Sequence, residues 1–266
     1  MRTARSQAGI LAQETLMSRM RRLALFLVWV PTILGQAQIP SVQPGAKIWV
    51  GRNQEIEEYL KTAECVAIRW FPPNKAAQCT LRPGGPVAKM AWRMGPPGIY
   101  GGFKESYKTE IAAYELDKLL KMDMVPPTVE RQLEGNRGAA QQWVENVVDA
   151  TDPAIPAGES RGHWENQLVR MTMFDNLIGN RERNKRNMLR DNAWGLTLID
   201  HSRAFGVEPL LYQKMSATDE AYWARIELLT RAQLDRALQP WLDPQEINAI
   251  LERREKMRAE IKSRPK

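Results

Sequence analysis

The sequence predicts an α+β fold of two lobes, with an antiparallel-sheet N-lobe and a mainly helical C-lobe. In the first half, short apolar stretches alternate with Pro- and Gly-rich breakers, a pattern that favours strands joined by short antiparallel connections. In the second half, longer segments repeat their apolar residues with helical spacing. With 43% hydrophobic and 26% charged residues, the 266-residue chain is typical of a globular protein rather than of a disordered or collagen-like one.

Residues 1–37 have the pattern of an export signal. A basic pair precedes an uncharged apolar run at residues 23–34, which is shorter than the about twenty residues that a bilayer span needs. Small residues then stand at the two positions that a signal peptidase reads, so cleavage is predicted after Ala37. The upstream part, residues 1–16, looks like an over-called start. The alternative is an uncleaved membrane anchor, and in both cases we expect the rest of the chain to be secreted or periplasmic.

The N-lobe is expected over residues 47–148, after a linker at residues 38–46. Asn53 is expected to cap a short helix. In an oxidising compartment Cys65 and Cys79 could form one disulfide, and two free thiols are the alternative. Strands are expected at residues 64–71, 78–81 and 87–92, a helix at residues 105–121, and a further strand within residues 139–147.

The C-lobe is expected over residues 164–251, after a linker at residues 149–163. Residues 252–266 are expected to form a charged C-terminal helix or tail. A strand-rich lobe and a helix-rich lobe joined by a linker indicate a cleft between the two. Helices are expected at residues 164–178, 231–238 and 244–262, and within residues 215–229.

The C-lobe contains the stretch that is most informative about chemistry. It reads GNRERNKRN at residues 179–187 and LTLIDHSRAF at residues 196–205. Glu182 precedes Asn187 by five residues, and Asp200 ends a short apolar strand farther on. Phosphoryl transfer from a nucleotide uses a carboxylate that orients the acceptor hydroxyl and two oxygen ligands that hold Mg²⁺ on the phosphates. The catalytic loop of protein kinases has these groups in the same order and spacing.

These two stretches resemble the G-N-x-D-R-x-x-x-N … I-D signature of bacterial kinase-like proteins related to the phosphoinositide 3-/4-kinases, the HipA kinases and the secretory-pathway kinases. The first lobe agrees, because ESYKTEIAAYELDKLLKMDMVPPTVER at residues 105–131 resembles the αC-helix region of that group. The similarity covers residues 49–205 and implies a two-lobed protein-kinase-like fold.

The resemblance also implies ATP and Mg²⁺ as cofactors and roles for single residues. Glu182 stands at the position of the catalytic base. Asn187 and Asp200 stand at the positions of the metal ligands. Glu110 corresponds to the αC glutamate that pairs with the lysine of strand three.

Two residues depart from the family pattern. The pattern places Asp where this chain has Glu182, and a carboxylate displaced by about 1 Å can cost roughly a hundredfold in rate. The A-W-K sequence expected at the end of strand three reads Ala91-Trp92-Arg93. Arg93 is therefore expected to hold the phosphates, with a donor geometry different from that of lysine. Lys89, four residues earlier on the same face of a regular strand, is the alternative donor.

The nucleobase and the phosphates have further expected contacts in the N-lobe. By the resemblance, adenine lies against a hinge at residues 144–147, with Glu145 and Val147 as nucleotide-binding residues. The turn at residues 72–76 holds the place of a glycine-rich phosphate loop but contains no glycine. A backbone nest for phosphate can be built from other residues, so this turn does not exclude binding.

The expected function is that of a phosphotransferase that moves the γ-phosphoryl group of ATP to an unidentified hydroxyl outside the cytoplasm. The acceptor could be a protein, a sugar or a lipid head group. The two departures favour an alternative, a pseudokinase that binds a nucleotide or a partner protein without turnover. A secreted adaptor with no nucleotide site is a third alternative, in which Glu182, Arg183 and Lys185 form a solvated charged loop.

The net charge of +7 first suggests a nucleic-acid partner. However, residues 1–37 hold five of the 38 basic and one of the 31 acidic residues, and residues 252–266 hold seven basic and three acidic ones. The body between them carries 26 basic against 27 acidic residues, a net charge of −1. We therefore expect no nucleic-acid partner, and membrane contact only through the signal segment or the basic C-terminal tail.

Overall fold

The structure is a computed structural model that describes residues 47–264, apart from residues 73–75, 102 and 182. The chain divides into two units, Met1–Ser41 and Val42–Lys266, and all elements below belong to the second unit. The predicted signal peptide and the predicted linker at residues 38–46 lie outside the described residues. Within the described part, no helix is both long enough and apolar enough to span a membrane.

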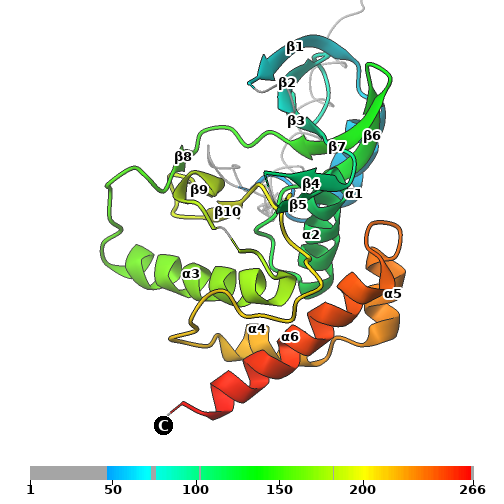
Figure 1. Ribbon diagram of the computed structural model, residues 1–266. Helices are drawn as coiled ribbons and strands as arrows, with labels where there is room; N and C mark the ends of the chain where they lie inside the picture. The colour runs from blue at the N-terminus through cyan, green and yellow to red at the C-terminus, as the bar shows by residue number, and fades with distance from the viewer. Residues whose placement is uncertain (1–46, 73–75, 102, 182, 265–266) are drawn as a thin grey trace, which may run out of the picture. The chain divides into compact units, whose positions relative to one another are not determined.

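The N-lobe is built on a five-stranded antiparallel sheet (Figure 1). Its strand order is β1-β2-β3-β7-β6, so β3 is the central strand. β6 and β7 form a hairpin whose turn uses positive φ angles of 49° at Glu134 and 79° at Gly135. The strands are β1 (Cys65–Phe71), β2 (Ala76–Leu81), β3 (Lys89–Met94), β6 (Thr128–Leu133) and β7 (Asn136–Gln142).

This sheet has a helix on each face. Trp92 of β3 packs in one apolar core with α1 (Asn53–Thr62). Neighbouring residues of a strand point to opposite faces of a sheet. Arg93 therefore points to the other face, where Ala139 packs against α2 (Tyr107–Leu120). The alternation of β3 thus directs Arg93 toward α2.

The C-lobe is mainly helical (Figure 1). Apolar residues of α2 share one core with those of the C-lobe helices, so α2 packs against both lobes. α6 begins at a capping box in which the Asp243 and Glu246 side chains each accept the other residue's backbone N–H. The helices are α3 (Glu159–Ile178), α4 (Glu220–Glu227), α5 (Arg231–Leu238) and α6 (Pro244–Lys262).

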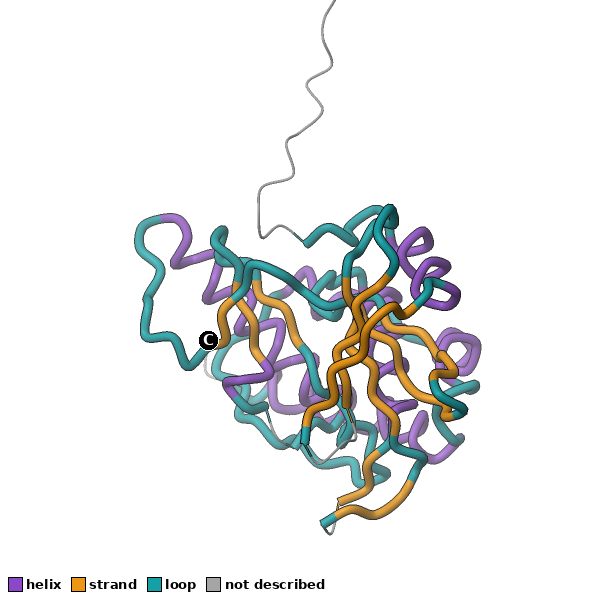
Figure 2. Tube along the Cα trace, turned by 90° about the horizontal axis from the view of Figure 1, so that it is seen from above, coloured by secondary structure: helices purple, strands orange, loops and turns teal. Residues whose placement is uncertain are grey.

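Two smaller sheets complete the fold, and Figure 2 shows all strands in orange beside the purple helices. β4 (Gly98–Tyr100) and β5 (Phe103–Glu105) form a hairpin just before α2. A three-stranded sheet has the order β10-β9-β8. Its hairpin of β9 and β10 connects a 3-10 helix, Lys185–Asn187, to Asp200. These strands are β8 (Val148–Asp149), β9 (Met188–Arg190) and β10 (Leu196–Leu198).

The predicted α+β architecture of two lobes is confirmed, with differences at several element ends. The helix expected from residue 164 begins at Glu159, inside the predicted linker. The strand expected within residues 139–147 ends at Gln142, so the expected hinge lies outside the sheet. α6 continues through residue 251 to Lys262 and buries Arg253 and Met257, so the first part of the predicted tail belongs to a C-lobe helix.

The expectation that Asn53 caps the first helix is wrong. Arg52 holds the N-cap position and makes no side-chain cap bond, and Asn53 is the first helical residue. The preceding turn includes Gly51 at a φ of 77°, which brings the chain into the helix one residue earlier.

Cys65 and Cys79 form a disulfide between β1 and β2. The sequence left open whether these cysteines form a disulfide or remain free thiols, and the structure has the disulfide. The register of the two strands pairs Cys79 with Ile68 and Cys65 with Leu81, so the two cysteines lie on adjacent strands. The disulfide joins the strands that lead into and out of the turn at residues 72–76.

Candidate active site

Four adjoining cavities form a cleft between the sheet and the C-lobe. We name them the hinge, central, polar and outer cavities, with volumes of about 470, 190, 210 and 400 Å³. Asn187 and Asp200 line both the central and the polar cavity, and Arg93 lines these two and the outer cavity. The residues shared by the hinge and central cavities are Ala91, Gln141, Trp143 and Ile199.

Arg93, Glu110 and Asp200 meet in the middle of this cleft. Arg93 comes from the end of β3, Glu110 from the first turn of α2, and Asp200 from the segment after β10. Nη1 of Arg93 lies 2.7 Å from Oδ1 of Asp200 and 3.4 Å from Oε1 of Glu110. The predicted ion pair between Arg93 and Glu110 is therefore present. Burial alone would raise the pKa of Glu110, but hydrogen bonding to His201 and the charge of Arg93 hold it below its usual value.

Asn187 and Asp200, the predicted metal ligands, lie side by side. Nδ2 of Asn187 is 3.4 Å from Oδ2 of Asp200. One carboxylate and one amide oxygen at the same cavity suit Mg²⁺, which proteins hold with few side chains plus the phosphates of a substrate. Among the described residues, no group of three or more His, Cys, Asp or Glu side chains could hold a metal ion. A metal at this pair would therefore take further ligands from a nucleotide or from water.

Asp200 has an uncommon backbone conformation that helps to place its carboxylate. Its φ is +59°, in the left-handed region that Asp tolerates better than most residues. The N–H of the next residue, His201, donates to Oε2 of Glu110 at 2.8 Å. Oγ of Ser202 donates to Oδ1 of Asp200 at 3.0 Å. The two residues after Asp200 thus hold this segment, His201 through α2 and Ser202 through the carboxylate of Asp200.

A buried ion pair holds the backbone beside both predicted metal ligands. Nε and Nη2 of Arg183 donate to the two carboxylate oxygens of Asp175 in α3, at 2.9 and 2.7 Å. Nη1 of Arg183 donates to the carbonyl oxygens of Asn187 and Ile199, at 3.1 and 2.9 Å. Burial alone would raise the pKa of Asp175, but Arg183 and Asn180 hold it below its usual value.

The hypothesis of a solvated charged loop is wrong for Arg183. Its side chain is only 4% exposed, because the fully buried Asp175 requires a cation. The sequence motifs did not indicate a role for Asp175. The signal available there was a charged residue inside the apolar end of a helix, next to Phe174 and close to Leu177, since a carboxylate is almost never buried without a partner.

His201 contacts both the ion pair of Arg183 with Asp175 and the side chain of Glu110. Its Nε2 lies 3.1 Å from Nη2 of Arg183, and a guanidinium can only donate, so Nε2 accepts and Nδ1 carries the proton. The ring is fully buried and packs edge-on against Phe174. His201 lines none of the four cavities, so it supports the site from beneath rather than contacting a ligand in it.

At the other end of the cleft, Glu145 and Val147 line the hinge cavity. Lys89, the alternative phosphate donor, lies here too, with its Nζ 2.7 Å from Oε1 of Glu145. The structure thus brings Arg93, and not Lys89, to Glu110. The rings of Phe71 and Trp143 stack with their centroids 6.3 Å apart and both line the central cavity, a pair that the sequence did not suggest.

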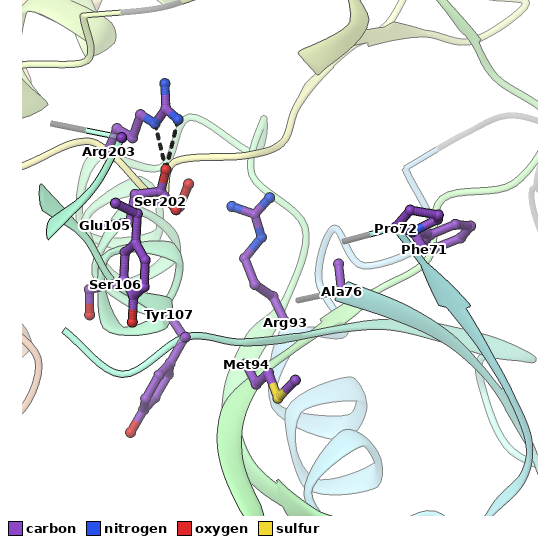
Figure 3. A pocket seen from close by; sticks show the side chains of 13 residues that line it. Phe71, Pro72, Ala76, Arg93, Met94, Glu105, Ser106, Tyr107, Ser202 and Arg203 are labelled. Carbon is purple, nitrogen blue, oxygen red and sulfur yellow. Dashed lines mark hydrogen bonds and ion pairs between the residues drawn. The ribbon is translucent and has the colours of Figure 1, made fainter. Parts of the chain in front are cut away.

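The outer cavity lies next to the turn that is predicted to cover the phosphates (Figure 3). Arg93 points into it, with Pro72 and Ala76 on one side and an ion pair of Glu105 and Arg203 on the other. Pro72 and Ala76 are the ends of the turn predicted to cover the phosphates, and residues 73–75 lie outside the described residues. Glu182, the predicted catalytic base, also lies outside them.

Comparisons with known proteins find similarity at the level of structure. No family model matches the sequence, and no curated protein matches it. The Golgi casein kinase with Mn/ADP bound superposes with a TM-score of 0.58 at 14% identity, covering 79% of this chain and 75% of that one. Hydra Fam20 with sugar has a TM-score of 0.58 at 15% identity, covering 79% and 88%. The Helicobacter pylori proinflammatory kinase CtkA has a TM-score of 0.52 at 10% identity, covering 78% and 99%.

These similarities establish the fold. The chain has the two-lobed protein-kinase-like architecture that the two sequence motifs implied. An antiparallel sheet with α2 forms one lobe, and helices α3 to α6 belong to the other.

Proposed function

We propose that this chain binds ATP with Mg²⁺ and transfers the γ-phosphoryl group to a hydroxyl acceptor. The observation that carries the proposal is the convergence of Arg93, Glu110, Asn187 and Asp200 in one cleft of a kinase-like fold. The Golgi casein kinase was solved with Mn/ADP bound, which supports a nucleotide and a divalent ion as ligands of such a cleft.

Each part of the cleft has a role in this proposal. The nucleobase lies in the hinge and central cavities, against Glu145 and Val147. Arg93, held by Glu110, contacts the phosphates. Asn187 and Asp200 would hold Mg²⁺, which when bound offsets the negative charge of the phosphates.

The transfer itself is an in-line displacement at phosphorus. The acceptor hydroxyl oxygen forms a bond to the γ-phosphorus while the bond from that phosphorus to the bridging oxygen breaks, and ADP leaves with this oxygen. The hydroxyl proton passes to the carboxylate of Glu182 and from there to solvent. The acceptor is a protein, a sugar or a lipid head group. Hydra Fam20 was solved with sugar, which makes sugars the first acceptors to try.

The proposed place of action is outside the cytoplasm. The export signal predicted for residues 1–37 is the reason. The disulfide between Cys65 and Cys79 supports it, because such bonds persist in oxidising compartments.

A catalytically impaired pseudokinase is the second candidate function, and one contact favours it. Arg93 donates to the same carboxylate, Asp200, that would hold the metal, at 2.7 Å. Together with Glu182 in place of Asp, this contact favours a protein that binds nucleotide without turnover.

Two measurements test the proposal. The first is the melting temperature of the purified protein with and without Mg-ATP, which nucleotide binding raises by mass action. The second is ADP release in the presence of sugar, protein and lipid acceptors. A rise in melting temperature with acceptor-dependent ADP release supports the enzyme, and a rise without ADP release supports the pseudokinase. If Mg-ATP leaves the melting temperature unchanged, both nucleotide-binding hypotheses are wrong, and a secreted protein with no nucleotide site stands.

Glu182→Asp separates an impaired enzyme from a protein with no turnover. It restores the carboxylate of the family pattern, so we expect turnover of an impaired kinase to rise, by up to roughly a hundredfold if the carboxylate is misplaced by about 1 Å. Binding of Mg-ATP should stay unchanged. No turnover in this variant, with unchanged binding, argues for the pseudokinase.

A further inference from the structure

The described charged side chains around Arg93 do not sum to zero. Arg93 supplies one positive charge to the carboxylates of Glu110 and Asp200, through one nitrogen that contacts both. The ion pair of Glu105 and Arg203 on the neighbouring wall is neutral as a pair. Among the residues that the structure describes here, Arg93, Glu110 and Asp200 therefore carry one net negative charge. A nucleotide adds the negative charge of its phosphates, so we expect its complex to need a further cation at this centre.

The oxygens of Asp200 are not equally open to that cation. Oδ1 accepts from Nη1 of Arg93 at 2.7 Å and from Oγ of Ser202 at 3.0 Å. Among the residues with described positions, Oδ2 has only the long contact of 3.4 Å with Nδ2 of Asn187. Mg²⁺ binds oxygen at about 2.0–2.1 Å. Because Arg93 and Ser202 already donate to Oδ1, an ion bound to this oxygen would have to displace one of them. Oδ2 of Asp200 and the amide oxygen of Asn187 therefore remain as the ligands for a metal.

Arg93 is also held where it is. It belongs to the central strand of the sheet, where it pairs with Ala76 of β2 and with Ala139 of β7. Its second partner, Glu110, is fixed by the N–H of His201. Within the described residues, Nε and Nη2 of Arg93 have no hydrogen-bond partner, so these donors can reach a phosphate while Nη1 keeps its carboxylates.

We propose that Arg93 takes the place of a second metal ion, so that this cleft binds its nucleotide with a single divalent cation. Protein kinases use two ions, held by the corresponding Asp and Asn. Here the guanidinium neutralises Oδ1 of Asp200 and also faces the phosphate end of the cleft. The inference rests on the proposed nucleotide binding, because the ion is counted in the nucleotide complex.

The substitution Arg93→Met follows directly from this assignment. Methionine keeps much of the apolar length of the side chain but removes the charge. Oδ1 of Asp200 then keeps only its hydrogen bond from Ser202, and the centre carries a second negative charge. A nucleotide complex of this variant should bind two divalent ions. Arg93→Gln, which also lacks the charge, should give the same count and serves if the methionine variant does not fold.

The experiment counts Mn²⁺ ions in the complex with a non-hydrolysable ATP analogue. Free Mn²⁺ is followed by electron paramagnetic resonance as MnCl₂ is added to the purified protein with saturating analogue. The matched control is Arg82→Met, because Arg82 lies in the same lobe, pairs with Glu64 on the surface and lines none of the four cavities. Circular dichroism establishes that each variant is folded.

The result expected is one Mn²⁺ per chain for the unchanged protein and for Arg82→Met, and two for the Arg93 variants. Two ions in the unchanged protein would overturn the inference and leave the proposed function standing. One ion in both the unchanged protein and the Arg93 variants would show that Arg93 does not set the count. If the protein binds no analogue with or without Mn²⁺, the proposed function fails and this inference fails with it.

Discussion

Arg183 and Asp175 determine the position of both predicted metal ligands without touching the cleft. One guanidinium satisfies a fully buried carboxylate and also the carbonyl oxygens of Asn187 and Ile199, the residues at which the two metal-ligand segments meet. A buried cation stabilises the fold only when all of its hydrogen-bond partners are present. Removing one of these groups leaves the others buried without a partner. The geometry of the site and the stability of the C-lobe should therefore depend on the same side chain.

We expect Arg183→Met to lower the free energy of unfolding by about 3–5 kcal/mol, the cost of breaking a buried pair by removing one partner. The matched control is Arg181→Met two residues earlier. Arg181 is 39% exposed and pairs with Glu208 at the surface, so its loss should cost less than about 1 kcal/mol. Urea unfolding at neutral pH measures both values. Equal effects of the two substitutions would contradict the role assigned to Arg183.

The pH dependence gives the same prediction a second readout. The pKa of folded Asp175 lies below its usual value, so its ionised form stabilises the fold above the unfolded pKa of about 3.9, and this contribution is lost as pH falls through the folded pKa. The difference between Arg183→Met and the unchanged protein should therefore be largest at neutral pH and shrink below about pH 4. A difference that persists into strong acid is the contrary result.

At the residue scale, the sequence predicted those site residues whose spacing along the chain is fixed by a catalytic motif. Asn187, Asp200 and Glu110 were found because their order along the chain follows a motif, and the structure brings the last two to Arg93. Asp175 and Arg183 were not found, because their partnership exists only once a loop has folded onto the end of α3. Spacing alone gives no measure of burial, so a charged loop residue looks solvated until its neighbour is known.

At the scale of elements, α2 is the helix that assembles the site. Glu110 on α2 reaches Arg93 of the sheet and the backbone of His201, while apolar residues of the same helix pack in the C-lobe core. Its periodic apolar residues predicted the helix well, and the structure has it at Tyr107–Leu120 within the expected residues 105–121. Its packing against both lobes was not predictable, because periodicity defines an apolar face but not the partner that covers it.

The disulfide between β1 and β2 is the element-scale feature that is easiest to test. It joins cysteines 14 residues apart, and a loop of about 15 residues corresponds to roughly 3 kcal/mol of stabilisation, with a usual range of about 2–4 kcal/mol. We expect a reducing agent to lower the free energy of unfolding of the unchanged protein by this amount. The Cys65→Ala/Cys79→Ala variant should be less stable by a similar amount and insensitive to the reductant. An unchanged protein that ignores the reductant would mean that the free thiols are the native state.

At the scale of the whole molecule, the order of lobes could be predicted and the cleft could not. Breakers and periodicity separate a strand-rich half from a helix-rich half, and the structure confirms both. The cleft depends on which side chains face it. Arg93 faces it because β3 alternates about Trp92, whereas Lys89 pairs with Glu145 at the hinge. Which side chains face the cleft depends on where the strands end. The strand predicted within residues 139–147 was expected to end several residues later than β7 does.

The predicted export signal implies that the N-terminus is processed. We expect the protein recovered from a host that exports it to begin at Gln38, because Gly35 and Ala37 place small residues at the two positions that a signal peptidase reads, after a short apolar run. Intact mass spectrometry of the exported fraction measures this directly. Ala37→Arg is the control, since a large charged residue at the cleavage position should block processing and leave the chain in the membrane fraction. Finding the unchanged protein unprocessed in that fraction would favour the membrane anchor, and finding it unprocessed in the cytosol would contradict both alternatives.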